Sequence, residues 1–332
     1  MRPATENKIV LVVRRTRLDE LIARFNTEDQ ARFYVEHLGA DFADYRLEDQ
    51  VYKKALQQVE ASLGRIGRLH VLNRTYLPNY VFGAQDTVVA LGQDGLVANI
   101  LKYLDGQPVF GVNPDPARWE GVLVQFAAEE LEGAVQGVMT GRGHLKRVTM
   151  AEAALNTGHV LLGVNDIFIG ARTHTSARYM IRTAQREEQH SSSGIIVSTG
   201  LGSTGWLRSV LAGASGIVSS ASGHEVRLEE PTEFPWDAEF LRFSVREPWP
   251  SRVTGARVTF GKITHEEPLV LLSQRGRVEH GGDDPRDSLL FELDDGFVPV
   301  RSGGKVRRGE PIPTDRTWVE GGETPGGPAV NQ

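Results

Sequence analysis

The chain has 332 residues, no cysteine, a hydrophobic share of 40% and a formal net charge of −6. This length predicts about two domains, each long enough to bury its own core. The lack of cysteine excludes disulfides, cysteine-bound zinc, iron–sulfur clusters and a thiolate nucleophile, so the chemistry must use oxygen and nitrogen groups.

The charge and the first residues bear on location and partners. An acidic balance argues against general binding to nucleic acid or anionic lipid. The opening MRPATENKIV lacks the basic and then apolar pattern of a secretory signal, and no apolar run approaches the roughly 18 residues of a membrane helix. We therefore expect a cytoplasmic protein with no membrane or nucleic-acid partner.

Short apolar runs alternate with helix-like segments in the first part of the chain. Strands are expected at 8–14, 69–73, 86–91 and 108–113, and helices at 17–37, 49–65, 96–104 and 127–139. This βαβ alternation predicts an α/β domain over residues 1–142 with a Rossmann-like parallel sheet covered by helices.

The pattern then changes to short β-prone stretches separated by Gly, Pro, Ser and Asp. These stretches are 147–155, 159–164, 179–184, 194–199, 239–245, 256–261, 268–273 and 288–293. They predict a mainly antiparallel, β-rich second domain over residues 143–305. Residues 306–332 are rich in Gly and Pro and poor in apolar residues, so we expect a disordered tail.

The first candidate site is LGQDGLV, residues 91–97, between an expected strand and an expected helix. Gly92 and Gly95 permit a tight turn in which backbone N–H groups and the helix dipole hold a phosphate. Gln93 completes this donor phosphate loop, and Asp94 supplies a carboxylate there. The alternative is that Asp-Gly is a common turn pair.

The second candidate is the glycine-rich stretch SSSGIIVSTGLGSTGW, residues 191–206. Its N–H groups and hydroxyls offer many donors to an anionic or nucleotide ligand. Gly200, Gly202 and Gly205 have the G-x-G-x-x-G spacing, but the stretch lies in the β-rich half instead of a βαβ unit. A glycine-rich β-turn loop is the alternative.

The third candidate is the pair Asn165-Asp166 between two apolar runs. Both side chains accept hydrogen bonds and the amide also donates, so the pair is suited to ribose hydroxyls. Alternatively, the pair caps a hairpin. Other chemistry is disfavoured, because the histidines lack zinc-site spacing and the sequence has neither a P-loop nor a nucleophile elbow.

In order and spacing, these three segments resemble the NAD kinase family. Its members carry G-G-D-G-T after a strand, then an Asn-Glu pair, then T-x-x-G-S-T-A-Y, where this chain has GQDGL, Asn165-Asp166 and TGLGSTGW. The stretch PVFGVNPDPARWEGVL, residues 108–123, and Ser192-Ser193-Gly194 look like the mitochondrial-type branch of that family.

The resemblance implies an NAD kinase-like two-domain fold with the active site between the domains. It also implies phosphoryl transfer from ATP, another nucleoside triphosphate or polyphosphate to the 2′-hydroxyl of the adenosine ribose of NAD. Asp94 matches the catalytic aspartate and is the expected base. Mg²⁺ is expected on the donor phosphates with no metal site of the protein's own, and the chain is expected to form a homodimer or homotetramer.

Residues that bind NAD follow from the same correspondence. Asn165 and Asp166 are expected to bind NAD directly. The NAD pocket is expected to be lined by Thr204, Gly205 and Trp206, with a further hydroxyl from Ser209. The glycine-rich loop is expected to be shaped by Thr199, Gly202 and Ser203.

Several departures from the family pattern keep two alternatives open. Gln93 and Leu96 replace a glycine and a threonine of the donor loop, while Trp206 replaces a tyrosine and Asp166 a glutamate. A kinase of the same fold that acts on another nucleotide, sugar or lipid alcohol is the first alternative. A catalytically degenerate NAD(P)-binding regulatory protein is the second.

Overall fold

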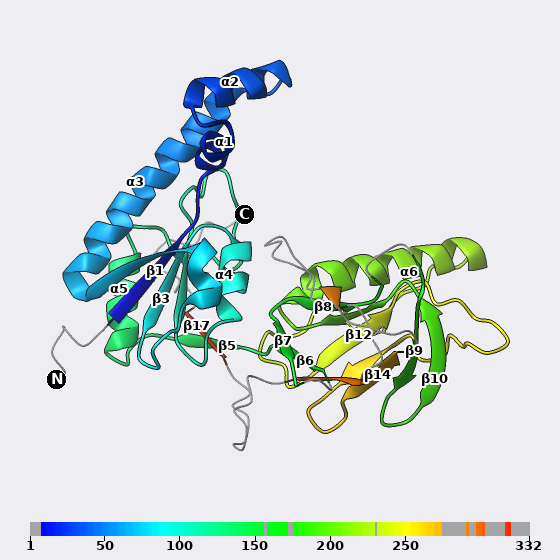
Figure 1. Cartoon of the computed structure of the whole chain (residues 1–332). Coiled ribbons are helices and arrows are strands. Elements are labelled where there is room, and N and C mark those ends of the chain that lie inside the picture. Colours follow the sequence, from blue (N-terminus) through cyan, green and yellow to red (C-terminus); the bar gives the residue numbers. More distant parts are fainter. Residues whose placement is uncertain are drawn as a thin grey trace, which may run out of the picture. The chain divides into compact units, whose positions relative to one another are not determined.

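The computed structural model describes residues 8–155, 158–171, 175–229 and 231–273, and the backbone of strands 290–291, 297–302 and 316–319 (Figure 1). The chain divides into two compact units, Met1–Lys146 with Thr317–Gln332, and Arg147–Arg316. Each is described by itself. Of the predicted tail 306–332, only Arg316–Val319 is described, as a strand, and for the rest disorder stays a prediction. The domain limits at 142 and 305 also stay predictions.

The first unit is built on a sheet of six described strands. Their order is β2 (Arg68–Asn73), β1 (Lys8–Val13), β3 (Thr87–Leu91), β4 (Val109–Val112), β17 (Arg316–Val319) and β5 (Leu145–Val148). The pairs β1–β2, β1–β3, β3–β4 and β4–β17 are parallel, which confirms the predicted parallel α/β sheet. Every residue of β3 and β4 is buried, as expected for a sheet that is covered on both faces.

Helices α1 (Arg17–Phe25), α2 (Glu28–His37), α3 (Phe42–Ile66), α4 (Asp94–Leu101) and α5 (Leu131–Met139) belong to this unit, with a 3₁₀ helix at Arg74–Asn79. Asn26 takes a left-handed conformation (φ 69°) and Thr27 caps α2, so the helix predicted over 17–37 is two helices. Residues of α3 and α5 share a core with β1, β3 and β4, while α4 contacts β3 and β4.

The second unit contains two sheets that share one hydrophobic core. The first has the order β10 (Glu187–Ser192), β9 (Ala177–Arg182), β14 (Leu269–Ser273), β16 (Phe297–Ser302), β6 (Ala151–Ala154) and β7 (Val160–Gly163). The second has the order β13 (Phe260–Ile263), β12 (Leu241–Val245), β11 (Ile195–Ser198), β8 (Asp166–Ile169) and β15 (Leu290–Phe291). Apart from the parallel pair β8–β15, the strand pairs with a described register are antiparallel, which confirms the β-rich prediction.

Alternate residues of the second sheet face that core. Ile167, Val197 and Phe243 belong to it, so Asp166, Phe168, Ser198 and Arg242 lie on the opposite face. Helix α6 (Trp206–Ser222), which the sequence analysis did not predict, follows β11 directly after the glycine-rich loop and lies beside the strands of this unit (Figure 1). That loop therefore joins a strand to a helix.

Candidate functional site

The donor loop has the local structure that the sequence predicts. Strand β3 ends at Leu91, the chain turns at Gly92, and α4 begins at Asp94. Gln93 is the N-cap residue and makes no side-chain capping bond, so the first N–H groups of α4 have no side-chain acceptor there. Such an N-terminus after a parallel strand is suited to a phosphate. Gly95 is exposed on the first turn.

The Asp94 carboxylate is held by backbone N–H groups of the segment Val122–Val124. Its Oδ1 accepts from the N–H groups of Leu123 (2.8 Å) and Val124 (3.2 Å), and its Oδ2 accepts from that of Val122 (3.0 Å). A carboxylate has about four lone-pair sites, so one on Oδ2 is left for a further donor. The three bonds fix the orientation of the group and leave it able to accept a proton from one direction.

Arg14 is a residue at this edge of the sheet that the sequence analysis missed. It follows β1, and its Cδ lies 3.7 Å from where a Cβ on Gly92 would stand. Its guanidinium contacts Glu48 (2.9 Å), and its Nε is buried with no partner among the described residues. Its backbone N–H donates to the Tyr52 hydroxyl, which donates to the Leu91 carbonyl (3.0 and 3.1 Å). Burial raises the pKa of Tyr52 to about 12, so the phenol stays neutral and keeps donating.

A positional signal for Arg14 exists in the sequence. The carboxyl ends of neighbouring parallel strands meet at one sheet edge, so the residue after the first strand is expected near the turn after the third. The register confirms this, because Val13 pairs with Leu91.

In the second unit, Asn165 and Asp166 lie at a corner between the two sheets. Strand β7 ends at Gly163 in one sheet and β8 begins at Asp166 in the other, so the alternative that the pair caps a hairpin is wrong. Asn165 is exposed, whereas Asp166 is half-buried. Oxygen Oδ1 of Asp166 is fully covered and has no hydrogen-bond partner among the described residues.

The glycine-rich loop packs directly on this corner. Thr199 donates from its N–H to the Asn165 carbonyl (2.9 Å) and from its hydroxyl to the Val164 carbonyl (2.6 Å). The Thr199 hydroxyl also accepts from the N–H of Gly202 (3.1 Å). A Cβ on Gly202 would collide with the Asn165 carbonyl and stand 2.9 Å from Asp166 Oδ1, so glycine is required by this close approach.

The rest of the loop leads into α6. The buried Ser203 hydroxyl donates to the Gly200 carbonyl (2.7 Å) and accepts from the Phe234 N–H (3.3 Å), so its role is structural. Gly205 is the N-cap of α6 and offers no side-chain cap, which leaves the first N–H groups of the helix without one. Thr204, Gly205 and Ser209 are exposed and Trp206 is half-buried.

Burial changes the acidity of Asp166. Desolvation raises the pKa of this carboxyl from 3.8 to about 6, and the neighbouring Ser198 hydroxyl offsets part of the rise. An acid with a raised pKa and an unfilled acceptor is typical of a binding site.

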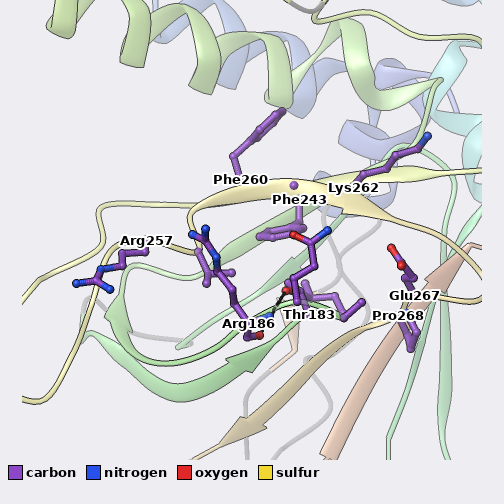
Figure 2. A pocket seen from close by; sticks show the side chains of 13 residues that line it. Thr183, Arg186, Phe243, Arg257, Phe260, Lys262, Glu267 and Pro268 are labelled. Atoms are coloured by element: carbon purple, nitrogen blue, oxygen red, sulfur yellow. Dashed lines mark hydrogen bonds between the residues drawn. The ribbon is translucent and has the colours of Figure 1, made fainter.

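A cavity of about 380 Å³ lies elsewhere in the second unit (Figure 2). None of the predicted site residues lines it. Arg186, Arg257 and Lys262 contribute positive charge, but they point in different directions (Figure 2). Lys262 Nζ lies 4.1 Å from the centre of the Phe240 ring. The cations do not converge as a phosphate site requires.

The predicted residues thus form two groups. The turn at Gly92–Gly95 with Asp94 belongs to the first unit, and the loop with Asn165 and Asp166 belongs to the second. Among the described residues, no three side chains of His, Asp or Glu gather in a metal-binding group, and no helix is long and apolar enough to cross a membrane.

Solved structures share the fold of the whole chain. An NAD kinase from Archaeoglobus fulgidus in complex with ATP matches with a TM-score of 0.54 and 15% identity, covering 94% of this chain and 93% of that one. A yeast NADH kinase complexed with NADH also gives a TM-score of 0.54 at 15% identity, covering 96% and 84%. The chain has the NAD kinase fold.

Sequence similarity to NAD kinases is weaker and partial. Those of Chlorobaculum tepidum and Chlorobium phaeobacteroides are 28% identical over 124 and 126 residues, which are 36% of this chain and 43% of each relative. The match therefore spans less than half the length of these relatives. No family model matches the chain. The resemblance to the mitochondrial-type branch stays a prediction.

Proposed function

We propose that this protein is an NAD kinase. It transfers the terminal phosphoryl group of ATP, or of another nucleoside triphosphate or polyphosphate, to the 2′-hydroxyl of the adenosine ribose of NAD. The observation that carries the proposal is that the exposed Asn165 and the neighbouring Asp166 pack against the glycine-rich loop, which leads into the uncapped N-terminus of α6. The amide of Asn165 and the carboxylate of Asp166 offer a donor and acceptors to ribose hydroxyls. Neighbours of the same fold bind ATP and NADH, which supports the choice of ligands.

The residues divide the work of the transfer. Asp166 and Asn165 bind the acceptor, with Thr204, Gly205, Trp206 and Ser209 around it, and Thr199, Gly202 and Ser203 hold the loop. The N–H groups around Gly92–Gly95 hold donor phosphates. The ribose oxygen bonds to the terminal phosphorus as the bond to the donor's bridging oxygen breaks, and Asp94 Oδ2 accepts the hydroxyl proton.

Magnesium belongs to the donor in this proposal. Mg²⁺ is usually bound by substrate phosphates with few protein ligands, and it neutralises charge on the transferring group. We assign it no residue of this chain. We also propose that the protein is cytoplasmic and forms a homodimer or homotetramer. Light scattering of the purified chain tests the oligomeric state.

A second candidate function is favoured by Leu96. Its buried side chain stands where the resembled family has a threonine, and its Cδ2 lies 2.9 Å from where a Cβ on Gly92 would be. The Leu96 side chain therefore packs against Gly92 in the donor loop, and the loop lacks the hydroxyl that a threonine would supply. A protein that binds NAD or NADP without turning it over would carry this loop.

One assay separates the two candidates. The purified chain is incubated with NAD, Mg²⁺ and either ATP, another nucleoside triphosphate or polyphosphate, and NADP is measured with an NADP-specific dehydrogenase. The proposal expects NADP with at least one donor. Tight NAD binding in calorimetry with no NADP from any donor supports the second candidate, and no binding of NAD overturns both.

A further inference from the structure

The predicted acceptor residues lack a positive charge. Among Asn165, Asp166 and residues 199–206, Asp166 has the one ionisable side chain. The proposed acceptor, however, carries negative charge on both phosphates of its diphosphate. A cation within reach would strengthen binding of this diphosphate, because hydrogen bonds between charged groups are stronger than those from neutral N–H groups.

Arg246 lies against the predicted site. Its Cζ is 5.6 Å from the centre of the Trp206 ring and 5.8 Å from that of Phe168, and the two rings stack at 5.6 Å with an interplanar angle of 28°. The Phe168 ring fills the space that side chains at Gly170 and Gly194 would need, each Cβ being 2.6 Å from a ring atom. The rings therefore rest on backbone and hold the guanidinium by cation–π contact.

The sheet places Arg246 on the same face as Asp166. Val245 points into the core between the sheets, so the next residue points to the opposite face, which Phe168 and Asp166 share. The backbone of Arg246 is fixed as well, because its N–H donates to the Gly194 carbonyl (2.8 Å) and its carbonyl accepts from the Ser193 N–H (3.0 Å).

The charge of Arg246 is available to a ligand. Its ion-pair partner, Glu247, is 65% exposed and 3.4 Å away, a geometry that contributes little in water. Two other arginines of this unit have different surroundings and partners. Arg208 is exposed and pairs with Glu233, and Arg242 is buried and donates to the Pro231 carbonyl (3.1 Å). A guanidinium in cation–π contact can exchange an exposed partner such as Glu247 for phosphate oxygens, which it binds in pairs through its N–H groups.

From this arrangement we propose that Arg246 binds the diphosphate of the dinucleotide acceptor. Trp206 and Phe168 position the guanidinium, so the aromatic pair contributes to acceptor binding through the arginine. The inference rests on the proposed function, since it takes NAD as the ligand. It adds a residue that selects acceptors containing a diphosphate over simple nucleosides.

The test compares ligands with and without the diphosphate. Affinities of the full chain for NAD, ADP-ribose and adenosine are measured by calorimetry, with adenosine measured by displacement if it binds weakly. Arg246→Gln is expected to weaken NAD and ADP-ribose by roughly 10- to 100-fold and adenosine by less than about twofold. Arg246→Lys is expected to fall between, because it keeps the charge and loses the paired N–H edge.

Controls separate binding from folding. Arg208→Gln removes an exposed arginine from the first turn of α6 and is expected to change each affinity by less than about twofold. In turnover, Arg246→Gln raises KM for NAD and leaves kcat within about threefold. Salt gives a readout on the unaltered chain: NAD affinity falls from 50 to 500 mM NaCl, and adenosine affinity does not.

The outcomes are distinct. Equal losses for adenosine and NAD in Arg246→Gln, or NAD affinity that does not depend on salt, overturn the diphosphate role. Unchanged NAD affinity in a folded Arg246→Gln, with normal NADP formation, overturns it and leaves the proposed function standing. A wild-type chain that binds neither NAD nor ADP-ribose overturns the proposed function and this inference together.

Discussion

Replacing Asp166 with asparagine is expected to stabilise the protein and to weaken its proposed binding of NAD. In the folded chain, burial raises the pKa of Asp166 to about 6, from 3.8 when the carboxyl is exposed. The folded state therefore disfavours the ionised form, and stability is lost as the pH rises from below 3.8 to above 6. Asparagine cannot ionise, so it avoids this loss.

The size of the effect follows from the two pKa values. At about 1.4 kcal/mol for each pH unit, the rise from 3.8 to about 6 corresponds to roughly 3 kcal/mol at pH 8 and about 1 kcal/mol at pH 4.5. The free energy of unfolding of Asp166→Asn is thus expected to exceed that of the wild type by up to these amounts. Binding of NAD is expected to weaken, because asparagine offers a weaker acceptor to a ribose hydroxyl.

Urea unfolding followed by circular dichroism at pH 4.5 and pH 8 measures the difference. Asp237→Asn is the matched control, since Asp237 is an exposed carboxylate of the same unit and its replacement should change stability by less than about 0.5 kcal/mol. A difference for Asp166→Asn that does not grow with pH would refute the desolvation argument. Undiminished NAD affinity in this variant would remove Asp166 from the site.

Three further substitutions test the rest of the site. Asp94→Asn should lower kcat by roughly 10²- to 10⁴-fold with NAD affinity retained, and full turnover in that variant would remove Asp94 as the base. Gly202→Ala should destabilise the chain by about 1 to 3 kcal/mol in urea unfolding, whereas Gly213→Ala, in open space on α6, should be neutral or stabilising by up to about 1 kcal/mol; equal effects would contradict the close packing of the loop. The double variant Gln93→Gly with Leu96→Thr should raise the rate of NADP formation if the donor loop limits turnover, and equal rates would count against that limit.

The local structure of the donor loop was predictable because its signals are short in range. An apolar run that ends at Leu91, followed by a glycine and an Asp-Gly pair, indicates a strand, a turn and a helix start within a few residues. The position of Asn165 and Asp166 between two strands was predictable for the same reason. Their place at a corner between two sheets was not, because it depends on which distant strands β7 and β8 join.

Helix α6 escaped prediction because its sequence lacks the usual contrast between faces. After Arg208, no residue of the helix is charged, and its glycines and serines have low helix propensity. Ile217 and Val218 are 72% and 50% exposed, so apolar residues do not mark a buried stripe. Arg14 and Arg246 were not predicted for a different reason. The pairing of strands that are distant in the sequence brings each of them beside the predicted site residues.

Asp94 in the first unit and Asp166 in the second have opposite environments, and the environments suit different roles in the proposed reaction. Asp94 receives three backbone N–H bonds, so its direction is fixed before any ligand arrives. Asp166 is desolvated, and its covered Oδ1 has no hydrogen-bond donor among the described residues. An oriented carboxylate with one free lone pair is suited to accept a proton, and an unsatisfied one is suited to bind. If the proposed function holds, the base belongs to the first unit and acceptor affinity to the second, so Asp94→Asn and Asp166→Asn are expected to separate kcat from binding.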